Sequence, residues 1–200
     1  MNKPKPLLVG ITGGIGAGKS TAAKIFNILG IPVYSADDRA KWLMANDQNL
    51  IVAITKAFGT GAYNTDRSLN KTFLAKEVFS DQEKTKTINK LVHPAVKIDF
   101  EDWASKQSSP YVLKEAALLF ETGSYKDLDK VINVSSPIKV RILRVLTRDP
   151  QRSEEQINAI IDRQMPDEQK NKLADFTIKN TDSKMLIPQV LKIHQSLIEK

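Results

Sequence analysis

Gly-Gly-Ile-Gly-Ala-Gly-Lys-Ser, at residues 13–20, is the stretch of this chain that decides its fold. It has the spacing Gly-x-x-x-x-Gly-Lys-[Ser/Thr] of a phosphate-binding loop. The apolar run at residues 7–12 predicts a short buried strand before the loop, and the helical spacing of apolar residues in 19–29 predicts a helix after it. A strand, a glycine loop and a helix in this order form an anion site, because main-chain N–H groups and the positive end of the helix dipole face the phosphates.

The loop and the first turn of the helix supply the candidate ligands of a nucleoside triphosphate. Lys19 is expected to place a positive charge at the β- and γ-phosphates, and the Ser20 hydroxyl is the expected ligand of Mg²⁺. The residues predicted to surround the phosphates are Gly14, Ile15, Gly16, Ala17, Gly18, Lys19, Ser20 and Thr21.

The composition is that of an ordinary soluble globular protein, with 200 residues, 41% hydrophobic and 26% charged. The absence of cysteine excludes disulfides and cysteine-based zinc sites, and two isolated histidines cannot form a metal cage. The apolar stretch before Gly10 is too short for a signal peptide, and no run approaches the roughly 20 apolar residues of a membrane span. A cytoplasmic protein that does not bind membranes is therefore expected.

The net charge of +7 is compatible with nucleic acid, an acidic membrane surface or small phosphorylated ligands. Most lysines are scattered and lack the interleaved aromatic residues of a nucleic-acid platform. Arg141, Arg144 and Arg148 are different, because their i, i+3 and i+7 spacing places them on one stripe of a predicted helix. This stripe is either a solvated basic face or a set of contacts to phosphates, and the choice stays open for Arg141.

The rest of the chain alternates between strand and helix patterns. Apolar runs predict further strands at residues 31–35, 110–114, 128–134 and 175–179. Repeated β-α alternation predicts an α/β fold, here the three-layer α/β/α sandwich of a P-loop NTPase with a parallel sheet. A last helix is predicted from residue 185 to Lys200.

Residues 48–107 lack strand patterns and are predicted to form a helical subdomain inserted into this fold. His93-Pro94 is expected to interrupt the helices there, since the residue before a proline disfavours the α region. The α/β core then comprises about 1–47, 108–136 and 174–200.

Two helix starts are predicted in the remaining segment, 137–173. Ser136 is the expected N-cap of a helix that has Pro137 at its first position and ends near Arg148. Ser153 and Gln156 have capping-box spacing and begin a second helix that runs to residue 164.

A phosphate-binding loop alone does not define a reaction, because kinases, GTPases and ATP-driven motors share it. Switch GTPases use Asn-Lys-x-Asp to select guanine, and the nearest string here, at residues 171–175, is one residue too long. The length of the chain fits a small-molecule kinase best. A nucleoside monophosphate kinase and a nucleic-acid-dependent ATPase remain as alternatives.

Asp37 is the leading candidate for the general base of a kinase reaction. It follows the predicted strand 31–35, and ligands of open α/β sheets bind at the carboxyl ends of the strands. The alternative is an acidic residue that simply favours the first turn of a helix through the helix dipole, and this is the preferred interpretation of Asp38.

Taken together, the motifs resemble those of the dephospho-coenzyme A kinase family, and the resemblance extends over nearly the whole chain. Ser35-Ala36-Asp37 resembles the family's Asp-Ala-Asp element, with serine in place of the first aspartate. The segment 117–121 resembles its Pro-Leu-Leu-Phe-Glu motif, with Ala117 in place of proline. The other matching segments are residues 12–20, 91–94, 144–149 and 174–180.

The resemblance implies that ATP phosphorylates the ribose 3′-hydroxyl of dephospho-coenzyme A. In this reaction Asp37 would orient or deprotonate the hydroxyl, while Lys19 and Arg148 would stabilise the charge on the transferred phosphoryl group. Arg144 would contact phosphates from a mobile lid, which we place at 137–173. A monomer or small homo-oligomer without nucleic-acid partners is expected.

Further site residues follow from the same resemblance, each with a simpler alternative. Glu115 would hold a metal-bound water near Ser20, or would be only a surface acid at a strand end. His93, Leu118 and Glu121 would contact the substrate, although His93 and Glu121 could instead serve local turns. Asn180 would contact the adenine of ATP, or act as an ordinary turn former.

Overall fold

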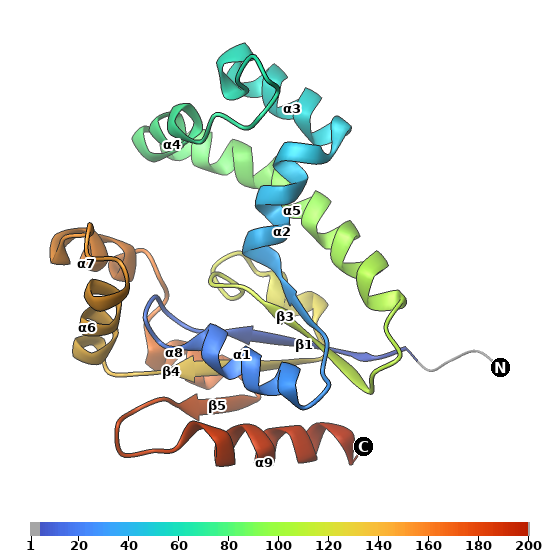
Figure 1. Ribbon diagram of the computed structural model, residues 1–200, viewed down its shortest axis with the longest axis vertical. Helices are drawn as coiled ribbons and strands as arrows, with labels where there is room; N and C mark the ends of the chain where they lie inside the picture. The colour runs from blue at the N-terminus through green and yellow to red at the C-terminus, as the bar shows by residue number, and fades with distance from the viewer. Residues whose placement is uncertain (1–4, 200) are drawn as a thin grey trace. The chain divides into compact units, whose positions relative to one another are not determined.

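The computed structural model describes residues 5–199 and contains a parallel sheet of five strands in the order β2-β3-β1-β4-β5 (Figure 1). Each neighbouring pair of strands runs in the same direction. This sheet with its helices confirms the predicted α/β fold. The strands are β1 (Leu7–Thr12), β2 (Val33–Ser35), β3 (Tyr111–Glu115), β4 (Lys130–Ser135) and β5 (Phe176–Lys179).

The chain forms two compact units. The first comprises the residues up to Ser35 and from Ala104 onward, and the second is Ala36–Trp103. The first unit holds the whole sheet together with α1 (Lys19–Ile28), the 3-10 helix η2 (Ser124–Asp127), α6 (Ile138–Arg148), α7 (Glu154–Asp162), α8 (Asp167–Leu173) and α9 (Leu186–Ile198). Residues 1–4 and Lys200, which the sequence-based boundaries include, lie outside the described residues.

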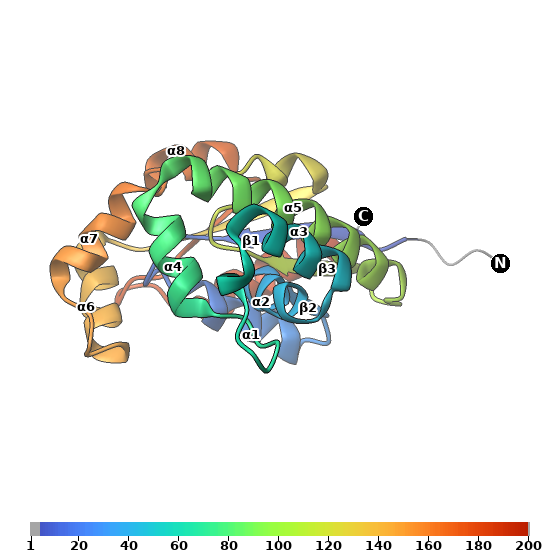
Figure 2. The ribbon, with the colours of Figure 1, turned by 90° about the horizontal axis from the view of Figure 1, so that it is seen from above.

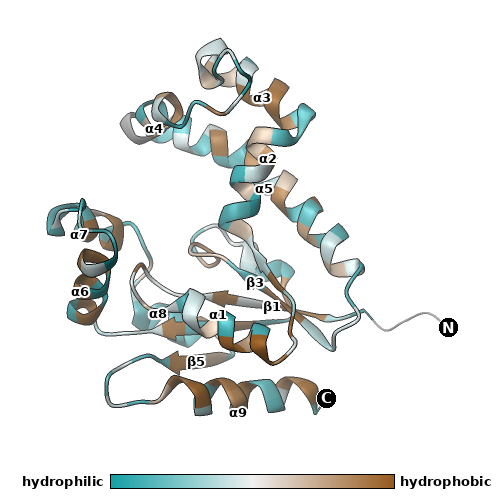
Figure 3. Cartoon of the chain, viewed as in Figure 1, coloured by the Kyte–Doolittle hydropathy of each residue, from teal (hydrophilic) through white to brown (hydrophobic). Residues whose placement is uncertain are grey.

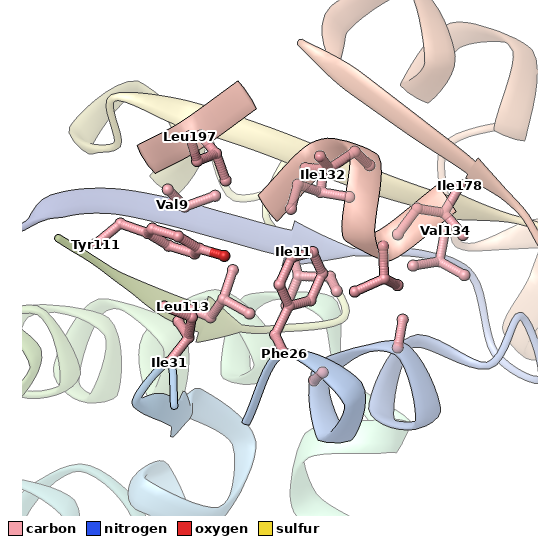
Figure 4. Packing of buried hydrophobic residues seen from close by; sticks show 14 of the residues in the cluster. Val9, Ile11, Phe26, Ile31, Tyr111, Leu113, Ile132, Val134, Ile178 and Leu197 are labelled. Carbon is pink, nitrogen blue, oxygen red and sulfur yellow. The ribbon is translucent and has the colours of Figure 1, made fainter. Parts of the chain in front are cut away.

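The main core of the first unit lies between the sheet and helices α1 and α9. Alternate residues of the strands point to this side, so that Val9, Ile11 and Leu113 are fully buried in one cluster with Phe26 of α1 and Leu197 of α9 (Figure 4). Burying such side chains contributes roughly 1.5–3 kcal/mol each. In Figure 3, α9 accordingly has hydrophobic and hydrophilic residues interspersed along its length.

The opposite face of the sheet has a smaller cluster. Leu119, Phe120 and Val131 are buried there, and α8 packs against β4. Helices α6 and α7 lie side by side (Figures 1 and 2). The sheet is therefore covered on both faces, as parallel sheets usually are.

The second unit is helical. It contains α2 (Ala36–Asn46), α3 (Gln48–Phe58), the 3-10 helix η1 (Thr60–Ala62), α4 (Lys71–Ser80) and most of α5 (Gln82–Ser105). Asp47 caps α3 by accepting a 2.9 Å hydrogen bond from the N–H of Leu50. No helix among residues 5–199 is long and apolar enough to cross a membrane.

The predicted interruption at His93-Pro94 is wrong, because α5 continues through Pro94. Val92, Val96 and Phe100 are buried at a four-residue spacing, which holds the segment helical on both sides of the proline. The carbonyl of Lys90, which loses its partner to the proline ring, belongs to an exposed residue that water reaches.

Two further differences concern the segment 137–173. Ser136 is not the N-cap of α6, because the helix begins at Ile138 with Pro137 in the cap position, and the Ser136 hydroxyl instead accepts a hydrogen bond from Arg144. Helix α8 was not predicted at all. The capping box of Ser153 and Gln156 is confirmed, with both of its hydrogen bonds present at the start of α7.

Candidate active site

The phosphate-binding loop connects β1 to α1, at the carboxyl end of the central strand. Because β1 lies between β3 and β4, this loop is flanked by the ends of both neighbouring strands. The register places Glu115, the last residue of β3, beside Ile11 of β1. The strand order thus brings an acidic side chain to the base of the loop.

Lys19, Ser20 and Glu115 form a polar cluster at this point. The Ser20 hydroxyl donates a 2.7 Å hydrogen bond to Glu115 Oε1, and Lys19 Nζ lies 3.4 Å from the same oxygen. The side chains of Lys19 and Glu115 are only 15% and 16% exposed, so their ion pair is shielded from solvent screening. Glu115 is therefore more than a surface acid at a strand end.

The donors of this cluster fit a Mg²⁺ ion. Ser20 and Glu115 both offer oxygen, the ligand atom that Mg²⁺ prefers. No group of three or more His, Cys, Asp or Glu suited to a metal occurs among the described residues. In proteins Mg²⁺ usually keeps several waters and binds substrate phosphates as well as protein oxygens.

Two glycines are required by the conformation of the loop. Gly16 and Gly18 have φ angles of +75° and +90°, in a region that residues with a side chain rarely adopt. A Cβ at Gly16 would also collide with the carbonyl of Arg141, and one at Gly18 with the side-chain amide of Asn180. The glycines thus allow other parts of the chain to approach the loop closely.

Arg141 is buried against the loop and does not belong to a solvated face. The residue is 4% exposed, and its Nε donates a 2.9 Å hydrogen bond to the carbonyl of Ile15. Its Nη1 lies 3.3 Å from Asp167 Oδ1. Burial lowers the pKa of Arg141, and the nearby charge of Asp167 partly opposes this effect. In this structure the guanidinium therefore supports the loop through the carbonyl of Ile15.

Gln164 also contacts the loop, and sequence reasoning missed it. Its Oε1 accepts a 2.9 Å hydrogen bond from the N–H of Ile15. Ile15 is one of the predicted phosphate ligands, but its N–H is bonded to the side chain of Gln164. A glutamine just after a helix carries no motif, and only the tertiary contact identifies it.

Asn180 and Arg144 meet on the other side of the loop. Asn180 Nδ2 donates a 2.8 Å hydrogen bond to the carbonyl of Ala17. Arg144 Nη1 donates to Ser136 Oγ at 3.3 Å and to the carbonyl of Asn180 at 3.4 Å. Both predicted nucleotide ligands thus lie at the loop.

Arg148, at the last turn of α6, is paired with an acidic neighbour. Its Nε and Nη2 donate to the two carboxylate oxygens of Asp149 at 3.1 and 2.8 Å. This hydrogen-bonded pairing lowers the pKa of Asp149 and raises that of Arg148. The Arg148 side chain is 65% exposed, so a ligand can reach it.

Leu118 and Glu121 lie in the segment that follows β3. Leu118 is 43% exposed, whereas the next two residues are buried. Glu121 Oε1 accepts a 2.9 Å hydrogen bond from the N–H of Met165 and lies 2.9 Å from the buried Nζ of Lys170. Lys170 Nζ makes no hydrogen bond with any of the described residues, so its contact with Glu121 is an ion pair. Glu121 therefore links its own segment to the start of α8.

The remaining candidates belong to the helical unit. Asp37 and Asp38 are exposed in the first turn of α2, and Asp38 pairs with Lys41 at 3.1 Å. His93 is an exposed residue in the middle of α5. Both acids lie where the helix dipole favours a negative charge.

Known proteins resemble the chain over almost its full length. The profile of the family described as dephospho-CoA kinase matches residues 7–185. A dephospho-CoA kinase of Bacteroides fragilis is 36% identical over 193 residues, which cover 96% of this chain and 93% of that protein.

Two solved structures agree with these sequence matches. A crystal structure from Thermus thermophilus has 34% identity and a TM-score of 0.83, covering 96% of this chain and 98% of the other. The dephospho-CoA kinase of Campylobacter jejuni has 28% identity and a TM-score of 0.69, covering 96% and 97%. The chain therefore belongs to the dephospho-CoA kinase family, whose activity is the final step of coenzyme A biosynthesis.

Proposed function

We propose that this kinase transfers the γ-phosphoryl group of ATP to the 3′-hydroxyl of the ribose in dephospho-coenzyme A, which yields coenzyme A and ADP. Membership of the family supports the substrate and the use of ATP. The observation that carries the proposal is the cluster of Lys19, Ser20 and Glu115 at the glycine loop. In this cluster Lys19 offers a positive charge for the phosphates, and Ser20 and Glu115 offer oxygen atoms for a metal.

The loop holds the donor nucleotide. Helix α1 begins at Lys19, so the N–H groups of its first turn lack partners within the helix and are available to phosphate oxygens. Lys19 adds a positive charge that stabilises the phosphoryl group as charge develops during transfer. The proposed nucleotide contacts lie between Gly14 and Thr21, with Arg144 and Asn180 beside them, whereas the N–H of Ile15 is bonded to Gln164.

Ser20 and Glu115 are the residues that would hold Mg²⁺ with the nucleotide. The ion supplies neutralisation of phosphate charge and alignment of the triphosphate. Ser20 would contribute its hydroxyl oxygen, and Glu115, which accepts a hydrogen bond from Ser20, would hold a metal-bound water. Lys19 orients the Glu115 carboxylate through their ion pair.

Asp37 is the proposed general base, which orients the 3′-hydroxyl and accepts its proton. Its carboxylate is exposed, and it lies two residues after Ser35, which the register places opposite Glu115. The proposed contacts to the acceptor are His93, Leu118 and Glu121, of which His93 and Leu118 are exposed.

Arg148 is proposed to exchange Asp149 for oxygens of the transferred phosphoryl group. The Arg148 side chain is 65% exposed, and solvent screening weakens an ion pair at such a position. Closing this basic helix end over the nucleotide would exclude water, so that the phosphoryl group passes to the sugar hydroxyl and is not hydrolysed. We also propose that the enzyme acts in the cytoplasm, without nucleic acid, as a monomer or small homo-oligomer.

A coupled assay of ADP release tests the proposal. Dephospho-coenzyme A should support turnover, whereas nucleoside monophosphates and oligonucleotides should not. The 3′-deoxy analogue of dephospho-coenzyme A, which keeps its 2′-hydroxyl, should give no product. Turnover with nucleoside monophosphates alone, or ATP hydrolysis stimulated by oligonucleotides, would contradict the proposal.

A further inference from the structure

Both polar main-chain groups of Ile15 are held by side chains from the segment 137–173. The N–H donates to Gln164 Oε1, and the carbonyl accepts from Arg141 Nε, each at 2.9 Å. Arg141 Nη2 also donates to Gln164 Oε1 at 3.4 Å. Three hydrogen bonds therefore close a ring around one residue of the phosphate-binding loop.

Because the peptide bond is planar, these hydrogen bonds also orient the main-chain N–H groups that are expected to bind phosphate. In a trans peptide the carbonyl of one residue and the N–H of the next point to opposite sides. Because Arg141 holds the carbonyl of Ile15, the N–H of Gly16 is turned away from Arg141. In the preceding peptide, Gln164 holds the N–H of Ile15, while the carbonyl of Gly14 accepts a 3.0 Å hydrogen bond from the N–H of Ala17.

The ring is anchored to the sheet. Arg141 pairs with Asp167, whose other oxygen accepts hydrogen bonds from the Ser135 hydroxyl at 3.0 Å and the Ser136 N–H at 3.3 Å. Ser135 is the last residue of β4. The guanidinium is almost completely buried, and a buried charge is costly to release from its partner. The support is therefore tied to the end of β4.

We infer that Gln164 is a positioning residue for ATP. It acts with Arg141 to hold the two peptides on either side of Ile15, so that the Gly16 N–H faces the phosphates. The inference rests on the proposed function, because it assumes that the loop binds ATP. Without the ring, the peptides on either side of Ile15 would rotate between orientations. ATP binding would then include the entropic cost of ordering them. Gln164 itself contacts the loop and Arg141.

The main test compares three substitutions in the full-length enzyme. Gln164→Met keeps the length of the side chain but removes the acceptor, Gln164→Glu keeps an acceptor, and Gln169→Met changes an exposed glutamine of α8 as a control. Loss of a hydrogen bond of about 1.4 kcal/mol corresponds to roughly tenfold in affinity. Gln164→Met should thus raise the KM for ATP and the Kd for ADP about tenfold, and leave the KM for dephospho-coenzyme A within about twofold.

Rescue separates positioning from a general structural role. Gln164→Glu should return the Kd for ADP to within about threefold of the wild-type value, and Gln169→Met should not change it. An unchanged Kd for ADP in Gln164→Met would overturn the inference. The inference would also be overturned if Gln164→Met weakened the binding of both substrates equally and lowered the Tm, and if Gln164→Glu did not restore binding. A wild-type enzyme that fails to bind ADP would overturn the proposed function as well.

A double-mutant cycle with Arg141→Lys tests whether the two side chains act as a unit. Arg141→Lys keeps the charge but removes the Nε donor to Ile15. Each single variant should weaken ADP binding about tenfold, and the double variant should be close to either single one, because each substitution opens the same ring of hydrogen bonds around Ile15. A multiplicative loss of about a hundredfold would show independent effects and contradict the shared role.

Discussion

The Ser20 hydroxyl donates a 2.7 Å hydrogen bond to Glu115 Oε1, and this contact connects the phosphate-binding loop to the end of β3. A hydroxyl that donates to a carboxylate keeps its lone pairs for another partner. The hydrogen bond therefore orients the Ser20 oxygen as a ligand for a cation. In the proposed site, Glu115 would act on the metal through Ser20.

Glu115→Gln should increase the Mg²⁺ concentration needed for half-maximal activity by about 10–100-fold, as expected when an outer partner of a metal ligand is lost. The measurement is the initial rate as a function of Mg²⁺ at saturating substrates. Glu101→Gln, in an exposed position of α5, is the control and should behave as wild type. An unshifted Mg²⁺ dependence in Glu115→Gln would remove this residue from the metal site.

Lys19→Ala should impair triphosphate binding and turnover together, because its charge acts on both bound ATP and the transferred phosphoryl group. We expect kcat/KM for ATP to fall by about 10³-fold or more, the scale of an essential charge in a phosphoryl-transfer site. Isothermal titration with a nonhydrolysable ATP analogue and steady-state kinetics measure the two effects. A variant that loses turnover but binds the analogue normally would disagree with this double role.

Asp37→Asn should retain ATP binding but lose turnover by a factor on the order of 10² or more, as expected when a general base is removed. The neighbouring substitution Asp38→Asn is the matched control, because Asp38 shares the exposed first turn of α2 and forms a surface ion pair with Lys41. Its rate should remain within about twofold, since an exposed ion pair contributes little. Near-normal turnover in Asp37→Asn would show that another group accepts the proton.

Arg148→Ala should lower kcat more than it raises the KM for ATP, because the arginine is proposed to act on the transition state. A loss of about 10²–10³-fold is expected for one such charge. Arg152→Ala is the control, since Arg152 also pairs with Asp149, at 3.5 Å, and is likewise exposed. Equal losses in the two variants would point to a general electrostatic effect of the helix end.

A stability test uses Asp175, which lies just before β5. Burial disfavours its charge, but hydrogen bonds from Lys130 at 2.7 Å and from the Val131 N–H at 2.9 Å outweigh this effect and lower its pKa below 3.8. A depressed pKa stabilises the fold above the unfolded value, and this contribution is lost as the pH falls below about 3.8.

Asp175→Asn should therefore reduce the free energy of unfolding by about 1–2 kcal/mol at pH 7. Urea denaturation at several pH values should show this difference shrinking as the pH falls through about 4 and below. A difference that is constant with pH would mean that the charge of Asp175 contributes nothing.

Much of the fold could be predicted because it depends on local patterns. The glycine motif located β1 and α1, and apolar runs located the other strands to within two residues. Strand β2 is shorter than predicted, since it begins at Val33, directly after Pro32. Helix α8 was missed because it is short and polar, and Lys170 is its one buried residue. Its signals were Pro166 followed by two acids, which are favourable at a helix start.

The interior of α5 shows how burial can override a local rule. The proline rule predicted a break, yet the buried face around Val92 and Val96 keeps the helix continuous. The supports of the loop were beyond sequence reasoning for a different reason. Gln164 and Asp167 act only because the chain folds back onto residues far earlier in the sequence, with a separation of 149 residues in the case of Ile15 and Gln164.

Asn180 has a consequence for synthesis of the protein. Its amide supports the Ala17 carbonyl across 163 residues of sequence. The Gly-Lys-Ser motif is thus translated early, whereas Asn180, which contacts the loop, is translated near the end of the chain. The contact between Asn180 and the Ala17 carbonyl can therefore form only after β5 and Asn180 have been translated.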